Sequence, residues 1–570
     1  MVTPIPSKNV VKPTNSTETP AEKSSWRFGN LPAAELLPKL QQHLMKKNSQ
    51  VNWQLVWLNN DGRPVIGLLP KMAWRVYVDD DNGHSQPRSN VPIHSAADLQ
   101  TASKQPSLYQ VIKTSRDDNI KMTTTSSMCY DRWQEELIAY SQSYDSDHIH
   151  NSTLTISNEN DNQPSYHHGL IGFIGYDIAA HELSPAAKIE LAAQPCAVLG
   201  HYDIYLTPSD KKTGWTLNTI DLNPDSEATL AALVSYLDTL DNDLSNTENK
   251  ADCQPAPLVL KARWHKADYQ QAFAQTQDYL QQGDCYQINL TQAWQGCLLN
   301  KHKSSTAYQK SRNDKAVATL IDYLPALHRN TQAPFAGYLG VNNTINSTDK
   351  SALCFELLSC SPELFFTFIK ERDTTAHYIR TKPIKGTRPR GSDTEQDLAL
   401  KQQLVDSDKD RAENVMIVDL LRNDLGKYAK TGSVKVPHLF AIESFSNVHH
   451  MVSTITAELK PEAHPLAVLF GSLPAGSITG TPKKRAVEII SELEASARGA
   501  YCGSMGYMNF DGSGQWNVLI RTLQANSLAT AETEVSLWAG GGITVASDRD
   551  EEYQECLDKV GNLLKVLLQE

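Results

Sequence analysis

The stretch Cys285-Tyr-Gln-Ile-Asn-Leu-Thr-Gln-Ala-Trp294 alternates in polarity, with one polar face formed by Gln287, Asn289 and Thr291. A period of two residues is typical of a β-strand with one buried face. The preceding stretch, 266–282, has a helical period, and strands and helices then alternate irregularly to the end of the chain. Antiparallel strands with long helical returns indicate a large mixed α+β fold rather than a doubly wound parallel sheet.

The first half of the chain begins with weaker signals. Residues 1–25 are rich in Pro, Thr, Ser and Lys, and we expect them to be disordered because they offer too few apolar groups to offset the entropy of ordering. Residues 51–58 and 64–69 are rich in β-formers and flank the turn Asn60-Asp-Gly62, so they predict a hairpin. The repeatedly polar stretch from about 78 to 165 is interpreted as surface insertions rather than core.

Order returns after this polar stretch. The glycine-broken apolar run 169–177 and the run 197–206 predict strands, and 226–240 predicts a helix. Residues 241–256 have the composition of a linker. We therefore divide the ordered chain into an N-terminal region, 26–250, and a second region, 257–570.

Length and composition restrict the functional class. A chain of 570 residues is long enough for two or three domains, and a net charge of -12 without a sustained basic block argues against nucleic acid as a partner. The nine cysteines form no CxxC pair, so neither a disulfide framework nor a zinc site is indicated. No run of about 18 apolar residues and no signal peptide is found. We expect a soluble cytoplasmic protein that acts on a small metabolite or binds another protein.

One basic stretch stands out, Arg380-Thr-Lys-Pro-Ile-Lys-Gly-Thr-Arg-Pro-Arg390. Its Lys385 has other cations nearby, namely Lys382, Arg388 and Arg390. Neighbouring positive charges disfavour one more, so Lys385 is expected to lose its proton more easily than a free lysine, and an unprotonated amine is a nucleophile. The stretch is also compatible with an ordinary basic surface loop.

Carboxylates on two predicted helices indicate a cation site. In the helical stretch 406–424, Glu413 shares a face with apolar residues, so it must be paired, protonated or bound to a cation. In the last helix, Glu552, Glu555 and Lys559 share a face, and like charges one turn apart repel unless a cation lies between them. Oxygen ligands of this kind suit Mg²⁺. A helical salt bridge and a solvated charged face are the alternatives.

Two small-residue loops are candidate anion sites. The stretch 474–485 runs into a helix with Thr481 as the expected N-cap and Pro482 at the first helical position, which would direct backbone amides at a ligand. The glycines of 538–543 would allow amides to approach a ligand closely, and Arg521 could hold a carboxylate through two hydrogen bonds. Loops of this kind are also common as tight turns.

Two further residues could take part in chemistry. Glu363 is flanked by apolar aromatic residues, which would raise its pKa and suit a general acid or base. His450 lies in an expected buried strand, where a histidine is commonly a core residue with its hydrogen bonds satisfied.

Taken together and in order, these stretches resemble the chorismate-utilising enzymes over residues 257–570. The resemblance rests on the following motifs: Ser361-Pro-Glu363, Pro383-Ile-Lys-Gly-Thr387, Asp410-Arg-Ala-Glu-Asn414, His449-His-Met-Val-Ser-Thr454, Gly476-Ser-Ile-Thr-Gly480, Gly540-Gly-Gly-Ile543 and Glu552-Tyr-Gln-Glu555. Thr481 departs from many relatives, which have alanine there, and the match before residue 257 is thin. The resemblance implies an α+β fold of two large antiparallel sheets packed as a sandwich, with helices outside and the N-terminal 250 residues supplying one side.

Within the family, the lysine at position 385 resembles that of the aminodeoxychorismate synthases, the branch that aminates chorismate at C4. Anthranilate synthases typically carry alanine at this position. The resemblance implies conversion of chorismate and ammonia to 4-amino-4-deoxychorismate, toward 4-aminobenzoate and folate. Anthranilate synthase activity, or an inactive regulatory subunit that binds chorismate or tryptophan, are the rival readings.

The resemblance also implies roles for single residues. Lys385 would attack C2 of the ring, Glu363 would assist departure of the hydroxyl, and His450 would orient the ring. Magnesium would be held by Glu413 and Glu555, with Glu552 nearby. The remaining site residues would bind the two carboxylates of the substrate or line the site: Arg521, Tyr501, Lys559, Thr387, Gly476, Ser477, Thr479, Gly480, Gly540, Gly541 and Gly542.

Partners follow from what the sequence lacks. It has no Gly-x-Cys-x-Gly glutaminase elbow, because Gly296-Cys-Leu-Leu has no second glycine. Ammonia would therefore come from solution or from a separate glutaminase subunit, and we expect a heterodimer with such a subunit. Relatives can also hold tryptophan in the N-terminal half.

Overall fold

The computed structural model of the chain describes residues 25–47, 54–78, 107–116, 123–144, 163–209, 214–220, 224–246, 255–298, 319–342, 353–371, 374–444, 448–527 and 533–569. Apart from Ser25, the stretch expected to be disordered lies outside these residues, as do residues 51–53 of the first hairpin strand and residues 247–254 of the expected linker. Within this part of the chain, no helix is long and apolar enough to cross a membrane.

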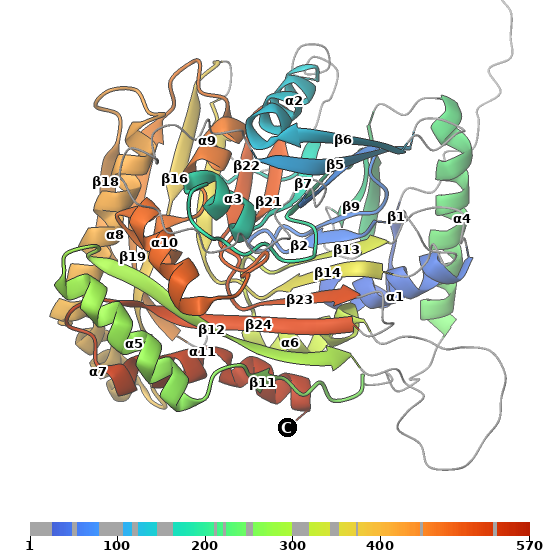
Figure 1. The fold of residues 1–570 in the computed structure, drawn as a ribbon. Coiled ribbons are helices and arrows are strands. Elements are labelled where there is room, and N and C mark those ends of the chain that lie inside the picture. Colours follow the sequence, from blue (N-terminus) through green and yellow to red (C-terminus); the bar gives the residue numbers. More distant parts are fainter. Residues whose placement is uncertain are drawn as a thin grey trace, which may run out of the picture.

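Two sheets, each of twelve strands, form the centre of the described fold (Figure 1). The first sheet has the strand order β1 (Ser25–Trp26), β10 (Trp215–Thr219), β9 (Ile204–Pro208), β3 (Val65–Gly67), β2 (Val56–Leu58), β13 (Gly337–Asn342), β14 (Leu353–Ser359), β23 (Thr522–Ser527), β24 (Thr533–Ile543), β12 (Gln287–Leu298) and β11 (Lys261–Ala262). A short strand, β20 (Gly480–Thr481), also pairs with β12.

The second sheet has the order β17 (Ile384–Pro389), β19 (Val448–Glu458), β16 (His377–Thr381), β15 (Leu364–Lys370), β22 (Gly514–Asn517), β21 (Ser504–Asn509), β7 (Gly169–Ile174), β8 (Ala197–His201), β4 (Met72–Val78), β5 (Leu108–Ser115) and β6 (Thr123–Cys129). β18 (Lys435–Ser444) pairs with β19. The strand pairs of both sheets are antiparallel, which confirms the predicted fold class.

Apolar side chains from the two sheets meet in one buried cluster. Val56, Leu339 and Phe355 come from the first sheet, and Phe173 and Tyr507 come from the second. These side chains are almost fully buried, so the sheets pack face to face as a sandwich. The predicted sandwich is thus confirmed.

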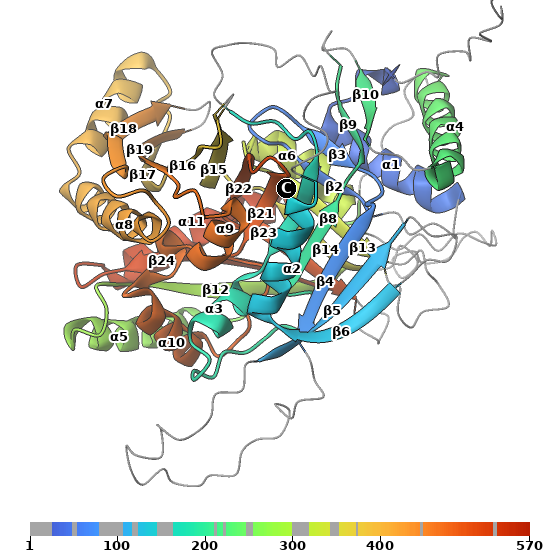
Figure 2. The same cartoon turned by 90° about the horizontal axis from the view of Figure 1, so that it is seen from above.

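Helices cover the outer faces of the sandwich (Figures 1 and 2). The helices are α1 (Ala33–Lys47), α2 (Tyr130–Gln142), α3 (Tyr176–Leu183), α4 (Pro224–Asn246), α5 (Lys266–Gln281), α6 (Leu324–Thr331), α7 (Thr394–Val405), α8 (Asp408–Gly426), α9 (Pro465–Ser472), α10 (Lys483–Glu494) and α11 (Arg549–Leu568), with short turns η1 (Phe28–Asn30), η3 (Leu320–Tyr323) and η4 (Gly476–Ile478).

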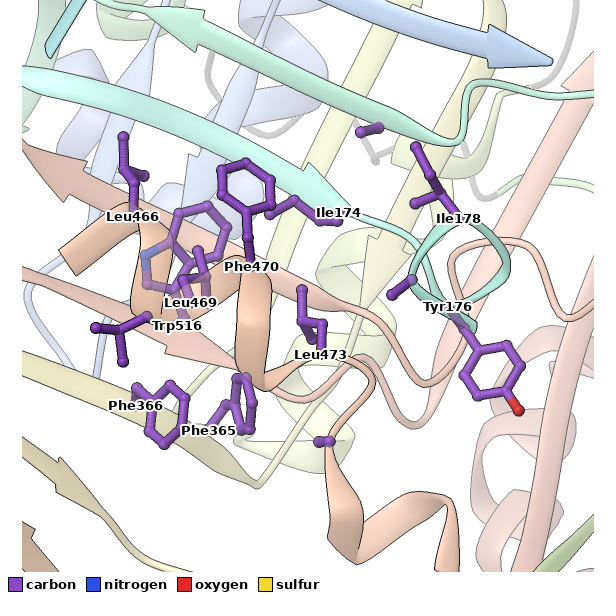
Figure 3. Close-up of a cluster of buried hydrophobic side chains, with 14 of the residues drawn as sticks. Ile174, Tyr176, Ile178, Phe365, Phe366, Leu466, Leu469, Phe470, Leu473 and Trp516 are labelled. Carbon is purple, nitrogen blue, oxygen red and sulfur yellow. The ribbon is translucent and has the colours of Figure 1, made fainter. Parts of the chain in front are cut away.

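The helix α9 illustrates how this cover is made. Its sequence is apolar around most of its circumference, and Leu466, Leu469 and Phe470 pack into a cluster with Trp516 and Phe366 of the second sheet (Figure 3). A helix that is apolar on all sides is stable in water only when both its faces are covered. Tyr130 and Trp133 of α2 also contact Phe470 of α9, with ring centroids 5.8 and 5.3 Å from that of Phe470.

The strand and the helix predicted in the stretches 285–294 and 266–282 are confirmed, since 287–294 falls on β12 and 266–281 on α5. The strand begins two residues later than predicted, and Gln282 is the C-cap of the helix. The hairpin is confirmed for its described residues, because β2 and β3 pair antiparallel.

The interpretation of 78–165 as surface insertions is wrong for the part that the structure describes. This stretch contributes β5, β6 and α2, and α2 buries Trp133 and Leu137 in the core of the second sheet. The sequence looks polar because β6 is an edge strand with most of its side chains exposed.

Three other expectations need correction. The run 197–206 is not one strand, since β8 and β9 belong to different sheets and buried Tyr202 and Asp203 lie between them. Residues 241–246 continue α4 instead of starting a linker. The N-terminal region supplies strands to both sheets rather than one side of the sandwich, because each sheet combines strands from before and after the expected boundary. The division of the chain into two domains stays a prediction.

Candidate active site

Lys385 lies on β17, at the edge of the second sheet, where the pairing with β19 is irregular between Ile384 and Thr387. Gly386 inside this irregularity has a φ of 83°, and an added Cβ would lie 2.7 Å from Leu404 and 2.8 Å from Asp410. Only glycine fits there. The Lys385 Nζ lies 3.9 Å from Glu413 Oε2, and each of these side chains is 16% exposed.

The three cations next to Lys385 in the sequence do not crowd it in the way that the sequence suggested. Each has a carboxylate partner of its own: Lys382 has Glu443 at 2.5 Å, Arg388 has Asp410 at 3.2 Å and Arg390 has Asp397 at 2.7 Å. The three cations therefore do not form the uncompensated cluster of positive charge around Lys385 that the sequence suggested. What surrounds Lys385 instead is a set of carboxylates.

Glu413 reaches this position from α8. The helix is capped by Ser407, whose side chain accepts a hydrogen bond from the amide of Asp410. The next residue, Asn414, is fully buried and accepts a hydrogen bond of 2.5 Å from Ser453 of β19, which fixes α8 against the second sheet. Burial raises the pKa of Glu413, although Lys385 and Lys409 oppose this effect.

Glu552 and Glu555 reach the same region from α11. Glu552 is almost fully buried, accepts a hydrogen bond of 2.7 Å from Ser547 and lies 3.5 Å from Lys409 of α8. Burial raises the pKa of Glu552, and the charge of Glu555 raises it further. Glu555 has a side chain that is 52% exposed and is paired with Lys559 at 2.7 Å. The charges of Lys559, Lys385 and Lys409 outweigh the partial desolvation of the carboxylate and leave its pKa below the ordinary value.

The glycines of β24 have two different roles. A Cβ added to Gly541 would lie 2.9 Å from Glu552 Oε2, 3.8 Å from Lys559 Nζ and 3.9 Å from Glu555 Oε1, so this glycine leaves space beside the charged groups of α11. At Gly542 an added Cβ would lie 2.6 Å from the amide nitrogen of Gln287. The carbonyl oxygen of Gly540 accepts a hydrogen bond of 2.8 Å from Lys559.

Glu363 lies between these groups and η4. It is 8% exposed, and Ser477 of η4 donates a hydrogen bond of 3.2 Å to its Oε1. Burial raises the pKa of Glu363, which outweighs the opposing charges of Lys385, Lys559 and Arg521. The expected cause of a raised pKa at this position is thus confirmed. Burial also lowers the pKa of the Arg521 guanidinium, while Cys360 and Glu363 oppose that shift.

His450 lies on β19, opposite Thr387 in the strand pairing, and the Thr387 hydroxyl is 2.8 Å from its Nδ1. The ring is 7% exposed. Burial lowers the pKa of His450 to about 4, and the charge of Arg521 lowers it too. The histidine is therefore neutral at physiological pH and adjoins the same cluster of charges.

The charged residues thus converge where α8, α11, β17 and β24 meet, on the side of the molecule opposite α1 and α4 (Figures 1 and 2). A scan against protein families matches residues 113–565 to the chorismate binding enzymes. The chain belongs to this family.

Similar proteins support the assignment of the chain to this family. Aminodeoxychorismate synthase component 1 of Klebsiella aerogenes is 38% identical over 411 residues, which cover 70% of this chain and 77% of that protein. The Salmonella typhimurium protein of the same name is 36% identical over 404 residues, covering 70% and 76%. Anthranilate synthase component I of Streptococcus pneumoniae has the same fold, with a TM-score of 0.57 at 22% identity over 84% of this chain and 95% of that one.

Four of the predicted substrate-binding residues of this chorismate binding enzyme make packing contacts or internal hydrogen bonds that the sequence did not predict. Tyr501 is fully buried and stacks on Trp538, with ring centroids 5.9 Å apart. Gly476 allows Leu420 of α8 to pack against η4, Gly480 lies on the β12 backbone, and the Thr479 hydroxyl donates to the carbonyl of Ala475. These contacts give each of the four a packing role, whatever they do with a ligand.

The prediction that Thr481 is the N-cap of α10 is wrong. Thr481 belongs to β20 and pairs with Gln287, so it continues a strand, and α10 begins only at Lys483 with Pro482 as its N-cap.

Two residues of the site were not singled out by the sequence. Lys409 is in the first turn of α8, where a cation is unfavourable because of the helix dipole, and that mismatch was the available signal. Gln287 is fully buried beside Gly542, and among the residues that the structure describes neither its amide nitrogen nor its amide oxygen has a hydrogen-bond partner. Its place on a polar strand face gave no hint that the amide would be left unpaired.

The carboxylates also bear on the expected magnesium site. Among the residues that the structure describes, no three His, Cys, Asp or Glu side chains are arranged closely enough to hold a metal ion. Magnesium, however, commonly takes one or two carboxylates and completes its shell with water and substrate. Glu413, Glu552 and Glu555 supply oxygen donors, and Gly541 leaves space next to two of them. The residues fit the ion, and the site stays a prediction.

Proposed function

We propose that this chorismate binding enzyme aminates chorismate at C4, forming 4-amino-4-deoxychorismate, as the catalytic component of an aminodeoxychorismate synthase. The 36–38% identity to proteins of that name supports the proposal. The observation that carries it is the position of Lys385, whose side chain is 16% exposed and whose amine lies 3.9 Å from Glu413. The charge of this amine also acts on Glu363 and Glu555. A nucleophilic lysine is the residue that this chemistry needs.

The first step forms a covalent adduct. The neutral amine of Lys385 attacks C2 of the ring, both ring double bonds shift by one position, and the C4–O bond breaks. The protonated carboxyl of Glu363 gives its proton to the departing hydroxyl, which leaves as water. The raised pKa of Glu363 favours the protonated form that this step requires.

The second step releases the enzyme. Ammonia attacks C4, both ring double bonds shift back, and the C2–N bond to Lys385 breaks, so that the lysine leaves as a neutral amine. The new ammonium group gives one proton to Glu363, which restores the acid for the next turnover. Lys385 therefore needs no net change of protonation over the cycle.

The substrate is a dicarboxylate, and the cations around the site provide for it. Arg521 and Lys559 would hold its carboxylates, while neutral His450, hydrogen-bonded to Thr387, would orient the ring without adding charge. Glu413 and Glu555, with Glu552, would hold Mg²⁺. A bound Mg²⁺ would neutralise the ring carboxylate and fix its position.

Ammonia would come from a glutaminase subunit in the cytoplasm, where the product would feed 4-aminobenzoate and folate synthesis. The sequence has no glutaminase elbow, and relatives carry the designation component 1, which implies a second component. Glutamine should support turnover only after that subunit is added. Tryptophan binding in the N-terminal half stays a prediction.

The test is mass spectrometry of enzyme treated with chorismate and Mg²⁺ in the absence of ammonia. We expect an adduct in the wild type that is absent from Lys385→Ala and present in Lys382→Ala, whose lysine pairs with Glu443 outside the site. With ammonia, Lys385→Ala should lose at least about a thousandfold in turnover. Full activity of Lys385→Ala without an adduct would exclude the covalent mechanism, and release of pyruvate with a fluorescent product would indicate anthranilate synthase instead.

A further inference from the structure

Three lysines face the three glutamates of the site, and one of them has no task in the proposed reaction. Lys385 lies 3.9 Å from Glu413, Lys559 lies 2.7 Å from Glu555, and Lys409 lies 3.5 Å from Glu552. The ammonium of Lys409 also faces the charges of Glu413 and Glu555. The ammonium group of Lys409 thus lies beside the same carboxylates that a divalent ion would bind.

The two ends of the Lys409–Glu552 pair differ in freedom. The Lys409 side chain is 47% exposed, whereas the Glu552 side chain is 4% exposed and is also held by Ser547. Lys559, in contrast, is tied to Gly540 as well as to Glu555. Lys409 can turn into solvent with the loss of the one ion pair that the structure records for it, the pair with Glu552.

The position of Lys409 in α8 makes this exchange easier. It is the second residue of the helix, where the partial positive charge of the helix dipole repels a cation. The lysine is therefore held over the helix N-terminus by Glu552 of α11 and by the charges of Glu413 and Glu555, although the helix dipole opposes it. A stronger cation at those glutamates would remove the reason for it to stay.

Charge balance gives the exchange a direction. With Lys385 as the neutral amine of the proposed reaction, Lys409 and Lys559 offset two of the three glutamates, so a divalent ion entering alone turns one uncompensated negative charge into one uncompensated positive charge. The cost falls if Lys409 leaves or if a dicarboxylate substrate enters with the ion. We propose that Lys409 is an internal counterion that competes with Mg²⁺ for Glu552 and its neighbours, so that the ion binds weakly to the free enzyme and tightly together with substrate. This inference rests on the proposed function.

The experiment is isothermal titration calorimetry of the full chain with MgCl₂ in the absence of chorismate. Lys409→Met, which keeps the length of the side chain and removes its charge, should bind Mg²⁺ about tenfold more tightly than the wild type. Lys266→Met is the matched control, because Lys266 pairs at 2.8 Å with Asp550 of α11, is 55% exposed and lies outside the cluster. Its affinity for Mg²⁺ should equal that of the wild type.

A second variant guards against misfolding. Lys409→Arg keeps the charge and should bind Mg²⁺ as the wild type does. The same titration with chorismate present should bring Lys409→Met and the wild type closer together. Equal or weaker Mg²⁺ binding by Lys409→Met without chorismate would overturn the competition, provided that binding is lost in Glu413→Gln. Binding that does not depend on Glu413 in any variant would instead refute the proposed metal site, and the inference with it.

Discussion

Two clusters of opposite charges lie within the same fold, and they are built differently. In the first, Arg498 and Glu494 are each about 1% exposed and are joined by two hydrogen bonds of 2.7 and 2.8 Å. The remaining donors of Arg498 reach the carbonyls of Ile478 and Asn289, and Glu494 also accepts two hydrogen bonds from Thr291. Each charged atom of this pair has partners supplied by the protein.

The candidate site is the second cluster. Two of its three ion pairs are longer, 3.9 Å between Lys385 and Glu413 and 3.5 Å between Lys409 and Glu552, whereas Lys559 and Glu555 are 2.7 Å apart. Burial raises the pKa of Glu413 and Glu552. A buried charge with incomplete partners is costly, so such a cluster is not explained by stability. The difference teaches that a structural ion pair satisfies its own hydrogen bonds, while a binding site leaves part of that task to a ligand.

Breaking the structural pair should have the largest effect on folding. Arg498→Met leaves Glu494 buried without its partner, and we expect a loss of about 3–5 kcal/mol in the free energy of unfolding. Urea denaturation followed by circular dichroism would measure it. The double variant Arg498→Met with Glu494→Leu removes both charges and should regain part of the loss. A loss below about 1 kcal/mol in the single variant would show that the pair is not the structural element described here.

His450 sharpens the comparison through pH. Its pKa is about 4 in the folded protein, below the ordinary value near 6.5, so between these values the unfolded chain binds more protons and stability falls as the pH falls. From about pH 7.5 to about pH 5, this single group should cost about 2 kcal/mol. Urea titrations of the wild type and His450→Gln at both pH values would measure it. The variant should lose less stability than the wild type on acidification, and an identical loss would contradict the assignment.

Much of the fold could be predicted from local signals, and the failures have a common cause. The stretches for β12, α5 and α8 carry clear periods and, for α8, a capping serine at Ser407. The run 197–206 was read as one strand because its break depends on Asp203, which is buried by an ion pair of 2.5 Å with Arg116 far away in sequence. Long-range pairing of this kind leaves no local pattern.

The candidate site was likewise predictable where it depends on local spacing and not where it depends on long-range pairing. Helical spacing placed Glu552, Glu555 and Lys559 on one face, and the structure brings them near Glu413 and Lys385. The surroundings of Lys385 could not be predicted, because the carboxylates that offset its cationic neighbours come from α7, α8 and β18. The sequence shows that cations lie near Lys385 along the chain, but only the folded structure shows that each of them is paired with a carboxylate from another element.

The smallest effect separates the two clusters most clearly. Because burial raises the pKa of Glu413 above its unfolded value, its ionised form costs stability at neutral pH, and this cost vanishes as the pH falls below the unfolded value. Glu413→Gln should therefore raise the free energy of unfolding by up to about 1 kcal/mol near pH 7 while abolishing Glu413-dependent Mg²⁺ binding. In the structural cluster, Glu494→Gln should do the opposite and lower it, because Arg498 loses its charged partner. Urea titrations near pH 7 and near pH 4.5 would compare the two variants with the wild type. If Glu413→Gln were as destabilising as Glu494→Gln, the glutamate would be part of the folding core, and the contrast between a satisfied pair and a site waiting for its ligand would fail.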